Sequence, residues 1–246
     1  MGRAFEYRKA SKMARWDKMA KTFSKIGKDI ALAVKAGGAD PDSNPSLRRC
    51  MQNAKGANMP KDNVERAIKK ASGADAEHYE EITYEGYGLG GVAFFVECTT
   101  NNPTRTVANV RAIFNKFDGS LGKNGELAFI FDRKGIFSID RSSIKMDWDD
   151  FEMEMIDGGA EDVESDDEEV LITTAFEDFG ALSHKLEELG MDVKSAELER
   201  IPNNSKEVTE EQFKINMKML DRFEEDDDVQ NVYHNMEITD ALLNSL

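Results

Sequence analysis

Cysteine, histidine and long apolar runs are all scarce in this sequence of 246 residues. The two cysteines, Cys50 and Cys98, form no CxxC pair, which excludes a disulfide scaffold and a cysteine-based zinc site. The three histidines are scattered, so the sequence predicts no metal centre. The longest apolar run, Gly91–Val96, is strand-sized and far short of the roughly 18 residues that a membrane helix needs.

The amino terminus has basic residues but lacks the apolar segment of a secretory signal. These absences predict a cytoplasmic protein without a membrane partner. Hydrophobic residues make up 40% of the chain and charged residues 33%, which argues against global disorder. A chain of this length is expected to form one to three domains.

The net charge of −16 hides a strong asymmetry along the chain. Residues 1–74 contain 17 Lys and Arg against 7 Asp and Glu, a difference of +10. The remaining residues contain 15 basic against 41 acidic side chains, a difference of −26. This segregation predicts that the basic part contacts a polyanion and the acidic part does not. The alternative is that the two parts neutralise each other within the molecule.

The basic part has the pattern of three short helices. From Asp17 onward apolar residues recur every three or four positions, on one helical face, until Gly37-Gly38 ends the helix. Lysines occupy roughly the opposite face. A second helix is expected from Pro45, with Ser43 or Asn44 as its N-cap, and a third from Pro60, with proline at the first helical position in both.

After residue 79 the pattern changes to strands and helices. Strands are expected at 82–87, 92–98 and 127–131, with a helix at 101–117. A second series follows, with strands at 136–139, 162–164, 170–173 and 193–201 and helices at 148–156 and 176–189. Its order, βαββαβ, is that of the ferredoxin-like split βαβ unit. A helix at 210–223 and a strand at 229–236 would complete the first series, and 239–246 is expected to be a tail.

The predicted fold class is therefore α+β, with an N-terminal three-helix domain and two ferredoxin-like α/β domains. The predicted boundaries are 1–78 for the basic helical domain and 134–203 for the inserted ferredoxin-like domain. The middle α/β domain is discontinuous, with residues 79–133 plus 204–246.

No segment has the pattern of an active site. The glycines of Tyr87–Gly91 lie between two strands, which favours a hairpin turn over a phosphate-binding loop. The carboxylates between Asp147 and Glu154 fit a helix start, and the run Glu224–Asp228 fits a solvated loop. Cys50 is either a buried thiol or one whose pKa is lowered by nearby cations. We expect no enzymatic activity, no cofactor and no small-molecule substrate.

Nucleic-acid binding has more support, because a lysine stripe and a basic arm occur together in the first 74 residues. Phe5, Tyr7 and Trp16 are interleaved with the cations of the arm, where they either stack on unpaired bases or pack against the helices. The candidate nucleic-acid-binding residues are Arg8, Lys9, Lys12, Arg15, Lys18, Lys21, Lys25, Lys28, Arg48, Arg49, Lys55, Lys61, Arg66, Lys69 and Lys70.

Several motifs resemble the YebC/PmpR family. They are Leu32-Ala-Val-Lys-Ala-Gly-Gly-Ala-Asp-Pro-Asp-Ser-Asn-Pro45, Ala54-Lys-Gly-Ala-Asn-Met-Pro-Lys-Asp-Asn-Val-Glu-Arg-Ala-Ile-Lys-Lys70, Tyr84-Glu-Gly-Tyr-Gly88 and Phe131-Asp-Arg-Lys-Gly135. The sequence departs from the family in its first residues, where a Gly-His-Ser-Lys-Trp run is common, and at Leu89, where proline is common.

The resemblance implies three domains and no enzymatic activity. Members of the family are labelled as probable transcriptional regulators that bind DNA. Relatives also include translation factors that act on ribosomes, among them a mitochondrial translational activator and bacterial proteins linked to proline-rich stalls. The partner implied is thus DNA, or ribosomal RNA on the ribosome, and the sequence does not choose between them. A third possibility is a protein-interaction module whose basic head is neutralised internally.

Overall fold

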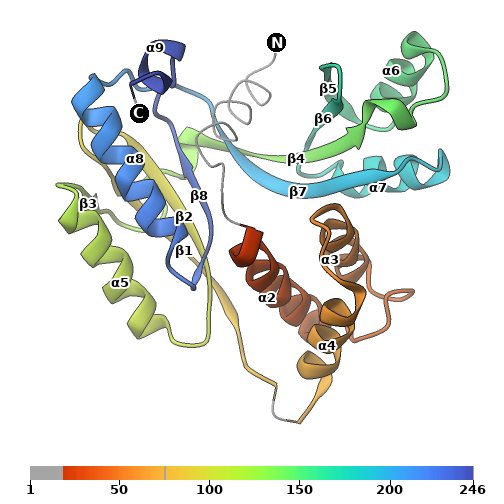
Figure 1. The fold of residues 1–246 in the computed structure, drawn as a ribbon, viewed down its shortest axis with the longest axis horizontal. Helices are drawn as coiled ribbons and strands as arrows, with labels where there is room; N and C mark the ends of the chain where they lie inside the picture. Colours follow the sequence, from red (N-terminus) through yellow and green to blue (C-terminus); the bar gives the residue numbers. More distant parts are fainter. Residues whose placement is uncertain (1–18, 75, 246) are drawn as a thin grey trace. The chain divides into compact units, whose positions relative to one another are not determined.

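Three helices begin the described part of the chain, which comprises residues 19–74 and 76–245 of the computed structural model (Figure 1). They are α2 (Met19–Gly37), α3 (Pro45–Gly56) and α4 (Lys61–Ser72). We call them the helical bundle. α2 packs against the other two, and Ile26, Ile30, Leu47 and Val64 share one buried core. The three predicted helices are thus present, and the apolar face of the first is confirmed.

The ends of the bundle helices follow local capping chemistry. Asn44 is the N-cap of α3, and its side-chain oxygen accepts a hydrogen bond from the backbone N–H of Leu47 at 3.1 Å. Pro45 is the first residue of α3, as predicted. The prediction for α4 was wrong by one residue, because Pro60 is the N-cap and the helix begins at Lys61.

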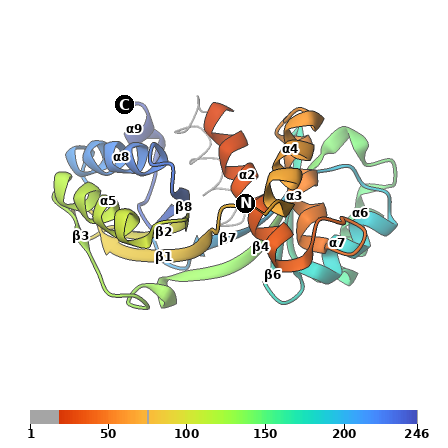
Figure 2. The same cartoon turned by 90° about the horizontal axis from the view of Figure 1, so that it is seen from below.

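The next part of the chain forms a four-stranded antiparallel sheet in the order β3-β1-β2-β8. Its strands are β1 (Glu80–Tyr87), β2 (Ala93–Thr100), β3 (Ser120–Leu121) and β8 (Val229–His234). The helices α5 (Pro103–Lys116) and α8 (Glu210–Glu224) lie side by side on one face of this sheet (Figure 2). Phe94, Phe114 and Phe223 meet between the sheet and the helices, with ring centroids 5.0–6.5 Å apart. The centre of this sheet is a sequence-adjacent hairpin.

One predicted strand of this sheet is wrong. Residues 127–131 were expected to form a strand, but Ala128–Ile130 form a 3₁₀ turn, η1, and Phe131 begins β4. The cause is Glu85, a buried carboxylate that accepts hydrogen bonds from the backbone N–H groups of Gly125 at 2.7 Å and Leu127 at 2.5 Å. These bonds fix the backbone as a loop, and β3 takes the edge position instead.

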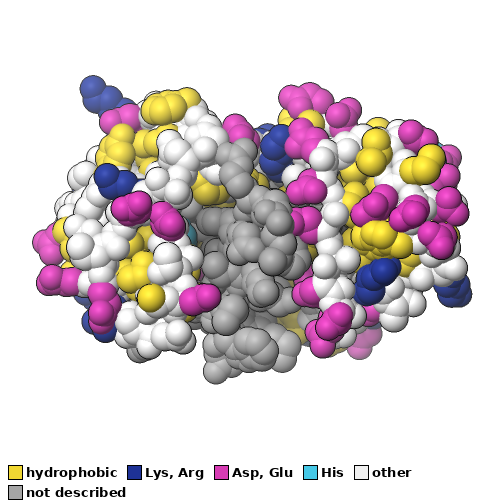
Figure 3. Space-filling model, turned by 90° about the horizontal axis from the view of Figure 1, so that it is seen from above, with side chains coloured by type: hydrophobic (Ala, Val, Ile, Leu, Met, Phe, Trp, Pro, Cys, Tyr) yellow, Lys and Arg dark blue, Asp and Glu magenta, His cyan; other side chains and the backbone are white. Residues whose placement is uncertain are grey.

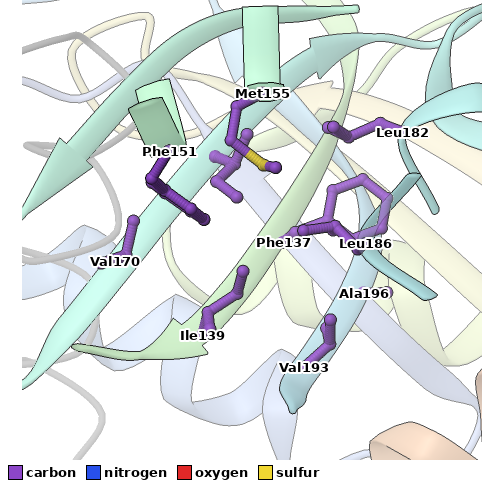
Figure 4. Packing of buried hydrophobic residues seen from close by; sticks show 10 residues of the cluster. Phe137, Ile139, Phe151, Met155, Val170, Leu182, Leu186, Val193 and Ala196 are labelled. Atoms are coloured by element: carbon purple, nitrogen blue, oxygen red, sulfur yellow. The ribbon is translucent and has the colours of Figure 1, made fainter. Parts of the chain in front are cut away.

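A second four-stranded antiparallel sheet lies in residues 133–201, which we call the acidic α/β region. Its order is β5-β6-β4-β7, the order of the split βαβ unit that the sequence predicts. Its elements are β4 (Phe131–Asp140), η2 (Arg141–Ser143), α6 (Trp148–Asp157), β5 (Ala160–Ser165), β6 (Glu169–Ala175), α7 (Phe179–Glu188) and β7 (Val193–Pro202). Phe137 of β4, Phe151 of α6 and Leu186 of α7 meet in its core (Figure 4).

The acidic run Glu224–Asp228 is only in part the solvated loop that the sequence predicts: residues 225–228 form a turn in which Glu225 and Asp227 are exposed, but the two ends of the run are buried. Glu224 is the last residue of α8, and Asp228 is buried, with 5% of its surface exposed. The Asp228 carboxylate accepts two-pronged hydrogen bonds from the Arg105 guanidinium, the shortest at 2.7 Å, and one from the Thr106 hydroxyl at 2.9 Å. A partner 123 residues away explains the burial, and local sequence gives no sign of it.

The described chain divides into two compact units. One holds the helical bundle and the acidic α/β region, through Ala76 and over Arg133–Ile201. The other holds Glu77–Asp132 and Pro202–Leu246. The expected tail contains a short helix, α9 (Asp240–Leu243). The finer division into three domains stays a prediction. No helix in residues 19–74 and 76–245 has the length and apolarity to cross a membrane.

Candidate nucleic-acid interface

Three lysines follow one another along one face of α2. Lys21, Lys25 and Lys28 are spaced by four and three residues, which places their side chains in one row on the helix. All three are half-buried, whereas Lys35 in the last turn is exposed. Ile26 and Ile30 face the core of the bundle. The predicted row of lysines is therefore present, but its side chains are less exposed than they would be on the side of α2 opposite the core.

One predicted site residue, Arg48, forms hydrogen bonds with the turn between α2 and α3. The side-chain amide of Asn44 donates hydrogen bonds to the carbonyl oxygens of Ala33 and Gly38, both at 2.8 Å. The Arg48 guanidinium donates to the carbonyl oxygens of Pro41 at 2.8 Å and Asp42 at 3.0 Å. Arg48 thus stabilises the turn, although the residue is exposed and its guanidinium has further donors.

Two further predicted site residues face the acidic α/β region. The Arg49 guanidinium lies 5.5 Å from the ring centroid of Phe179 on α7. Lys55 Nζ forms an ion pair with Asp192 at 2.8 Å, just before β7. Each of these cations has a contact within the chain, although the Lys55 side chain is 73% exposed, so both are weaker candidates for binding an external polyanion.

Asn53 lies between Arg49 and Lys55 in α3 and positions this helix against β7. The sequence analysis did not identify it. Its side-chain amide donates to the carbonyl oxygen of Ala196 at 3.1 Å and accepts from the N–H of Ala196 at 2.9 Å. Ala196 lies in β7, an edge strand, so α3 covers part of an open sheet edge. Gly56 allows the close approach, since a Cβ atom there would lie 1.7 Å from the carbonyl oxygen of Lys194. No local pattern could have shown a contact 143 residues apart.

The basic residues of α4 lie on its outer surface. Lys61 pairs with Glu65 at 3.6 Å, one helical turn away. Arg66 donates to the carbonyl oxygen of Asp62 at 3.2 Å and also bonds the Asn63 side chain. Lys69 and Lys70 are exposed in the last turn, where cations stabilise the helix dipole. The remaining predicted residues of the described chain thus lie on α2 and α4, two helices that pack against each other.

Five predicted site residues, Arg8, Lys9, Lys12, Arg15 and Lys18, lie outside the described residues, as do the three aromatic side chains of the arm. In the described bundle, residues 19–74, basic side chains still outnumber acidic ones by 11 to 5. The acidic α/β region shows the reverse, with 7 basic and 21 acidic side chains. The electrostatic asymmetry of the sequence therefore remains in the part of the chain that the structure describes.

Cys50 and the carboxylates at the start of α6, which have residue types found in active sites, have structural roles. Burial raises the pKa of the Cys50 thiol to about 12, assisted by Asp29, which contradicts a reactive low-pKa cysteine. Asp147 is the N-cap of α6, and Asp149 and Asp150 lie in its first turn, as predicted. Within residues 19–74 and 76–245 no group of three His, Cys, Asp or Glu side chains is placed to hold a metal ion.

The glycine-rich segment forms the predicted hairpin turn between β1 and β2. The N–H of Gly88 donates to the carbonyl oxygen of Val92 at 2.8 Å. The side chain of Asn216 on α8 bonds both backbone groups of Leu89, accepting at 3.0 Å and donating at 2.9 Å. The backbone groups of Leu89 are thereby satisfied within the protein and are not available to a phosphate.

Comparison with known proteins gives matches along nearly the whole chain. A family model described as the TACO1/YebC protein N-terminal domain matches residues 3–74, and one described as the TACO1/YebC second and third domain matches residues 79–236. A probable transcriptional regulatory protein of Bacteroides fragilis, BF2589, is 54% identical over 98% of each chain. One of Porphyromonas gingivalis is 52% identical over 96% of this chain and 97% of its own. The crystal structure of a conserved hypothetical protein, Aq1575, from Aquifex aeolicus is 38% identical, with a TM-score of 0.78 over 91% of this chain and 93% of its own.

Proposed function

Because the chain belongs to the TACO1/YebC family, we propose that it is a regulatory protein without catalytic activity that binds DNA through its basic helices. Relatives that are about half identical to it are named probable transcriptional regulatory proteins, which supports a regulatory role. The bound surface is formed by α2 and α4 of the helical bundle, extended by the basic arm that precedes α2.

The observation that carries this proposal is the segregation of charge. The bundle has 11 basic and 5 acidic side chains, and the acidic α/β region in the same compact unit has 7 and 21. Lys21, Lys25 and Lys28 form a row on α2, and Lys69 and Lys70 are exposed at the end of α4. Because acidic side chains repel phosphates, the contact with nucleic acid is local and restricted to the bundle and the basic arm that precedes it.

A charge-removal experiment tests the surface. The variants are Lys21→Gln with Lys25→Gln and Lys28→Gln on α2, and Lys69→Gln with Lys70→Gln on α4. Each lysine–phosphate interaction that a variant removes should reduce the steepness of log K against log salt concentration by about 0.9 on duplex DNA. Gel shifts across a salt series measure this slope.

The matched control removes two positive charges elsewhere, at Lys123 and Lys218, which are exposed outside the bundle. It should leave the slope unchanged. Equal weakening by the control and the bundle variants would show a general charge effect and contradict the proposed surface. Undiminished binding by both bundle variants would do so as well. Thermal unfolding of each variant checks that the fold is retained.

The second candidate function is that of a ribosome-associated translation factor, in which the same surface binds ribosomal RNA. The observation in its favour is the net charge of −16, which disfavours association along a long duplex and favours a contact set by RNA shape. Cosedimentation with ribosomes, run beside the gel shifts, separates the two. Saturable ribosome binding with weak, unselective DNA binding supports translation, and preference for one promoter over random DNA supports transcription.

The ion pair between Lys55 and Asp192 favours a third candidate, a protein-interaction module in which the bundle is the internal counter-charge. Replacing Lys21, Lys25 and Lys28 by Glu distinguishes it. If the bundle binds nucleic acid, binding is abolished and the fold persists. If the cations serve internal neutralisation, the protein unfolds at lower temperature, and the wild-type chain binds neither DNA nor ribosomes at low salt.

A further inference from the structure

Two of the large apolar side chains that are exposed in the described chain lie together on α6. Met153 is 64% exposed and Ile156 is 62% exposed. They are three residues apart, so they are neighbours on the same side of the helix. On the opposite side, Phe151 and Met155 are fully buried in the core (Figure 4). The helix is thus apolar on both sides, although only one side faces the core.

Carboxylates surround the exposed pair. We call the following residues the outer face of α6: Asp149, Asp150, Glu152, Met153, Ile156 and Asp157. The three aspartates are exposed and Glu152 is half-buried. On the face that Figure 3 turns to the viewer, acidic and apolar side chains are interspersed over the right-hand part of the surface, with few basic ones.

The stability of α6 does not account for all of these charges. Acidic residues in the first turn stabilise the helix dipole, which explains Asp149 and Asp150. Asp157 is at the opposite end, where the dipole favours a cation, and α6 has no basic residue in its last turn. The nearby Lys185 forms its ion pair with Glu154, so one cation faces several carboxylates. The outer face of α6 therefore keeps a surplus of negative charge around an apolar centre.

We propose that the outer face of α6 is a docking site for a basic amphipathic helix of another protein. The argument is charge complementarity: a partner must cover two apolar side chains and bring cations to the carboxylates beside them. Nucleic acid is repelled by this surface, and a neutral apolar partner would leave the carboxylates desolvated and unpaired. A helix with apolar residues at positions i and i+3 or i+4, flanked by Lys or Arg, satisfies both demands.

The inner anchoring of α6 makes the surface suitable for recognition. Phe151 and Met155 hold the helix on the sheet, and Trp148 at its start packs against Phe151 with a ring-centroid distance of 5.5 Å. The Arg141 guanidinium covers the Trp148 ring at 4.1 Å. Because α6 is fixed in this way, a partner binds a preformed surface and does not have to order it. The site is separate from the proposed nucleic-acid surface, so each can fail without the other.

The test uses the full-length protein and a synthetic peptide of leucine and lysine arranged with helical period. A second peptide of the same composition, in an order that gives no apolar face, is the control. Binding is measured by fluorescence anisotropy with wild-type protein and with the variant Met153→Ser, Ile156→Ser. Removal of each apolar side chain should weaken binding by about tenfold. The variant Asp150→Asn, Glu152→Gln should also weaken binding, most strongly at low salt.

A matched control variant is Phe129→Ser, which alters an apolar side chain that is 74% exposed elsewhere in the chain. It should bind the peptide like wild type. Equal binding of the two peptides would show that charge alone acts, and undiminished binding by the Met153→Ser, Ile156→Ser variant would show that the apolar pair is not used. Either result overturns the proposal. Sedimentation of the wild-type protein as a dimer, and of the Met153→Ser, Ile156→Ser variant as a monomer, would also overturn the proposal. The outer face of α6 would then bind a second copy of the chain.

Discussion

The helical bundle and the acidic α/β region carry opposite charge, with 11 basic to 5 acidic side chains in the first and 7 to 21 in the second. Both regions belong to one compact unit. The contacts that we describe between them include an exposed ion pair, but also the neutral amide of Asn53 on the backbone of Ala196 and the close approach at Gly56. The comparison teaches that opposite charges need not be the main attachment between oppositely charged regions. In the function that we propose, the charges act instead at the surfaces that bind partners.

The prediction with the largest expected effect tests whether the helical bundle and the acidic α/β region unfold together. Phe151→Ala removes a fully buried ring from the acidic α/β region and should lower the free energy of unfolding by about 3–5 kcal/mol. In a background with Trp16→Phe and Cys98→Ala, Trp148 fluorescence reports this region, and labelling of the buried Cys50 reports the bundle. If the unit is cooperative, both signals shift together to lower denaturant concentration.

The control for this prediction is Met153→Ala, which changes an exposed side chain on the same helix and should be nearly neutral. A shift of the Trp148 signal alone would contradict cooperativity. It would show that the bundle and the acidic α/β region fold as separate domains, as the boundaries predicted from the sequence imply.

The second prediction concerns the attachment itself. Gly56→Ala would place a Cβ atom 1.7 Å from the carbonyl oxygen of Lys194, so α3 and β7 must separate. We expect the free energy of unfolding to fall by about 1–3 kcal/mol and proteolysis between the bundle and the sheet to become faster. Differential scanning fluorimetry and limited proteolysis measure these effects.

Gly27 offers a matched control for Gly56. It lies within α2, and a Cβ atom there would meet no other atom within 4 Å. Gly27→Ala should therefore stabilise the protein by about 0.5–1 kcal/mol, because glycine is unfavourable inside a helix. A Gly56→Ala protein that is as stable as wild type would show that the two regions are not held at this distance.

The sequence predicts the regular elements of both regions well, because their signals are local. The period of α2, the cap at Asn44 and the succession of strands and helices along the acidic α/β region all follow from patterns within short windows. The failures have distant causes. Glu85 turns residues 125–127 into a loop, and Arg105 buries Asp228 from 123 residues away.

The candidate site shows the same limit. Basic residues can be counted from the sequence, and their concentration in the first 74 residues identifies the region of interest. Which of them also have a partner within the chain is decided by packing. Arg49 and Lys55 are basic like their neighbours in sequence, yet they contact Phe179 and Asp192. A single sequence holds no local signal for that difference.

The third prediction uses pH to compare the regions. Burial raises the pKa of Cys50 in the bundle to about 12, so the folded protein holds a proton that the unfolded chain releases at lower pH. The contribution to stability is present below the ordinary thiol pKa and disappears as pH rises toward about 12. Free energies of unfolding measured from about pH 8 to pH 11 should fall less steeply for Cys50→Ala than for wild type.

Tyr79, in the other compact unit, provides the control for this pH dependence. Burial and its hydrogen bond to Glu77 raise its pKa to about 12. Tyr79→Phe should flatten the remaining alkaline decline without changing the reactivity of Cys50 toward thiol reagents. A Cys50 thiol that reacts rapidly in the native protein near neutral pH would contradict the burial on which this prediction depends.

The smallest predicted effect bears most directly on the comparison. Lys55 and Asp192 form an ion pair at 2.8 Å, but their side chains are 73% and 69% exposed, and exposed pairs contribute about 0–1 kcal/mol. Lys55→Ala should therefore lower the free energy of unfolding only slightly, by an amount that disappears in high salt. Lys69→Ala, at an exposed position of α4, is the control for removal of a charge alone. If Lys55→Ala destabilised the protein as much as Gly56→Ala, charge would hold the two regions together, and the internal counter-charge would then become the better account of the bundle.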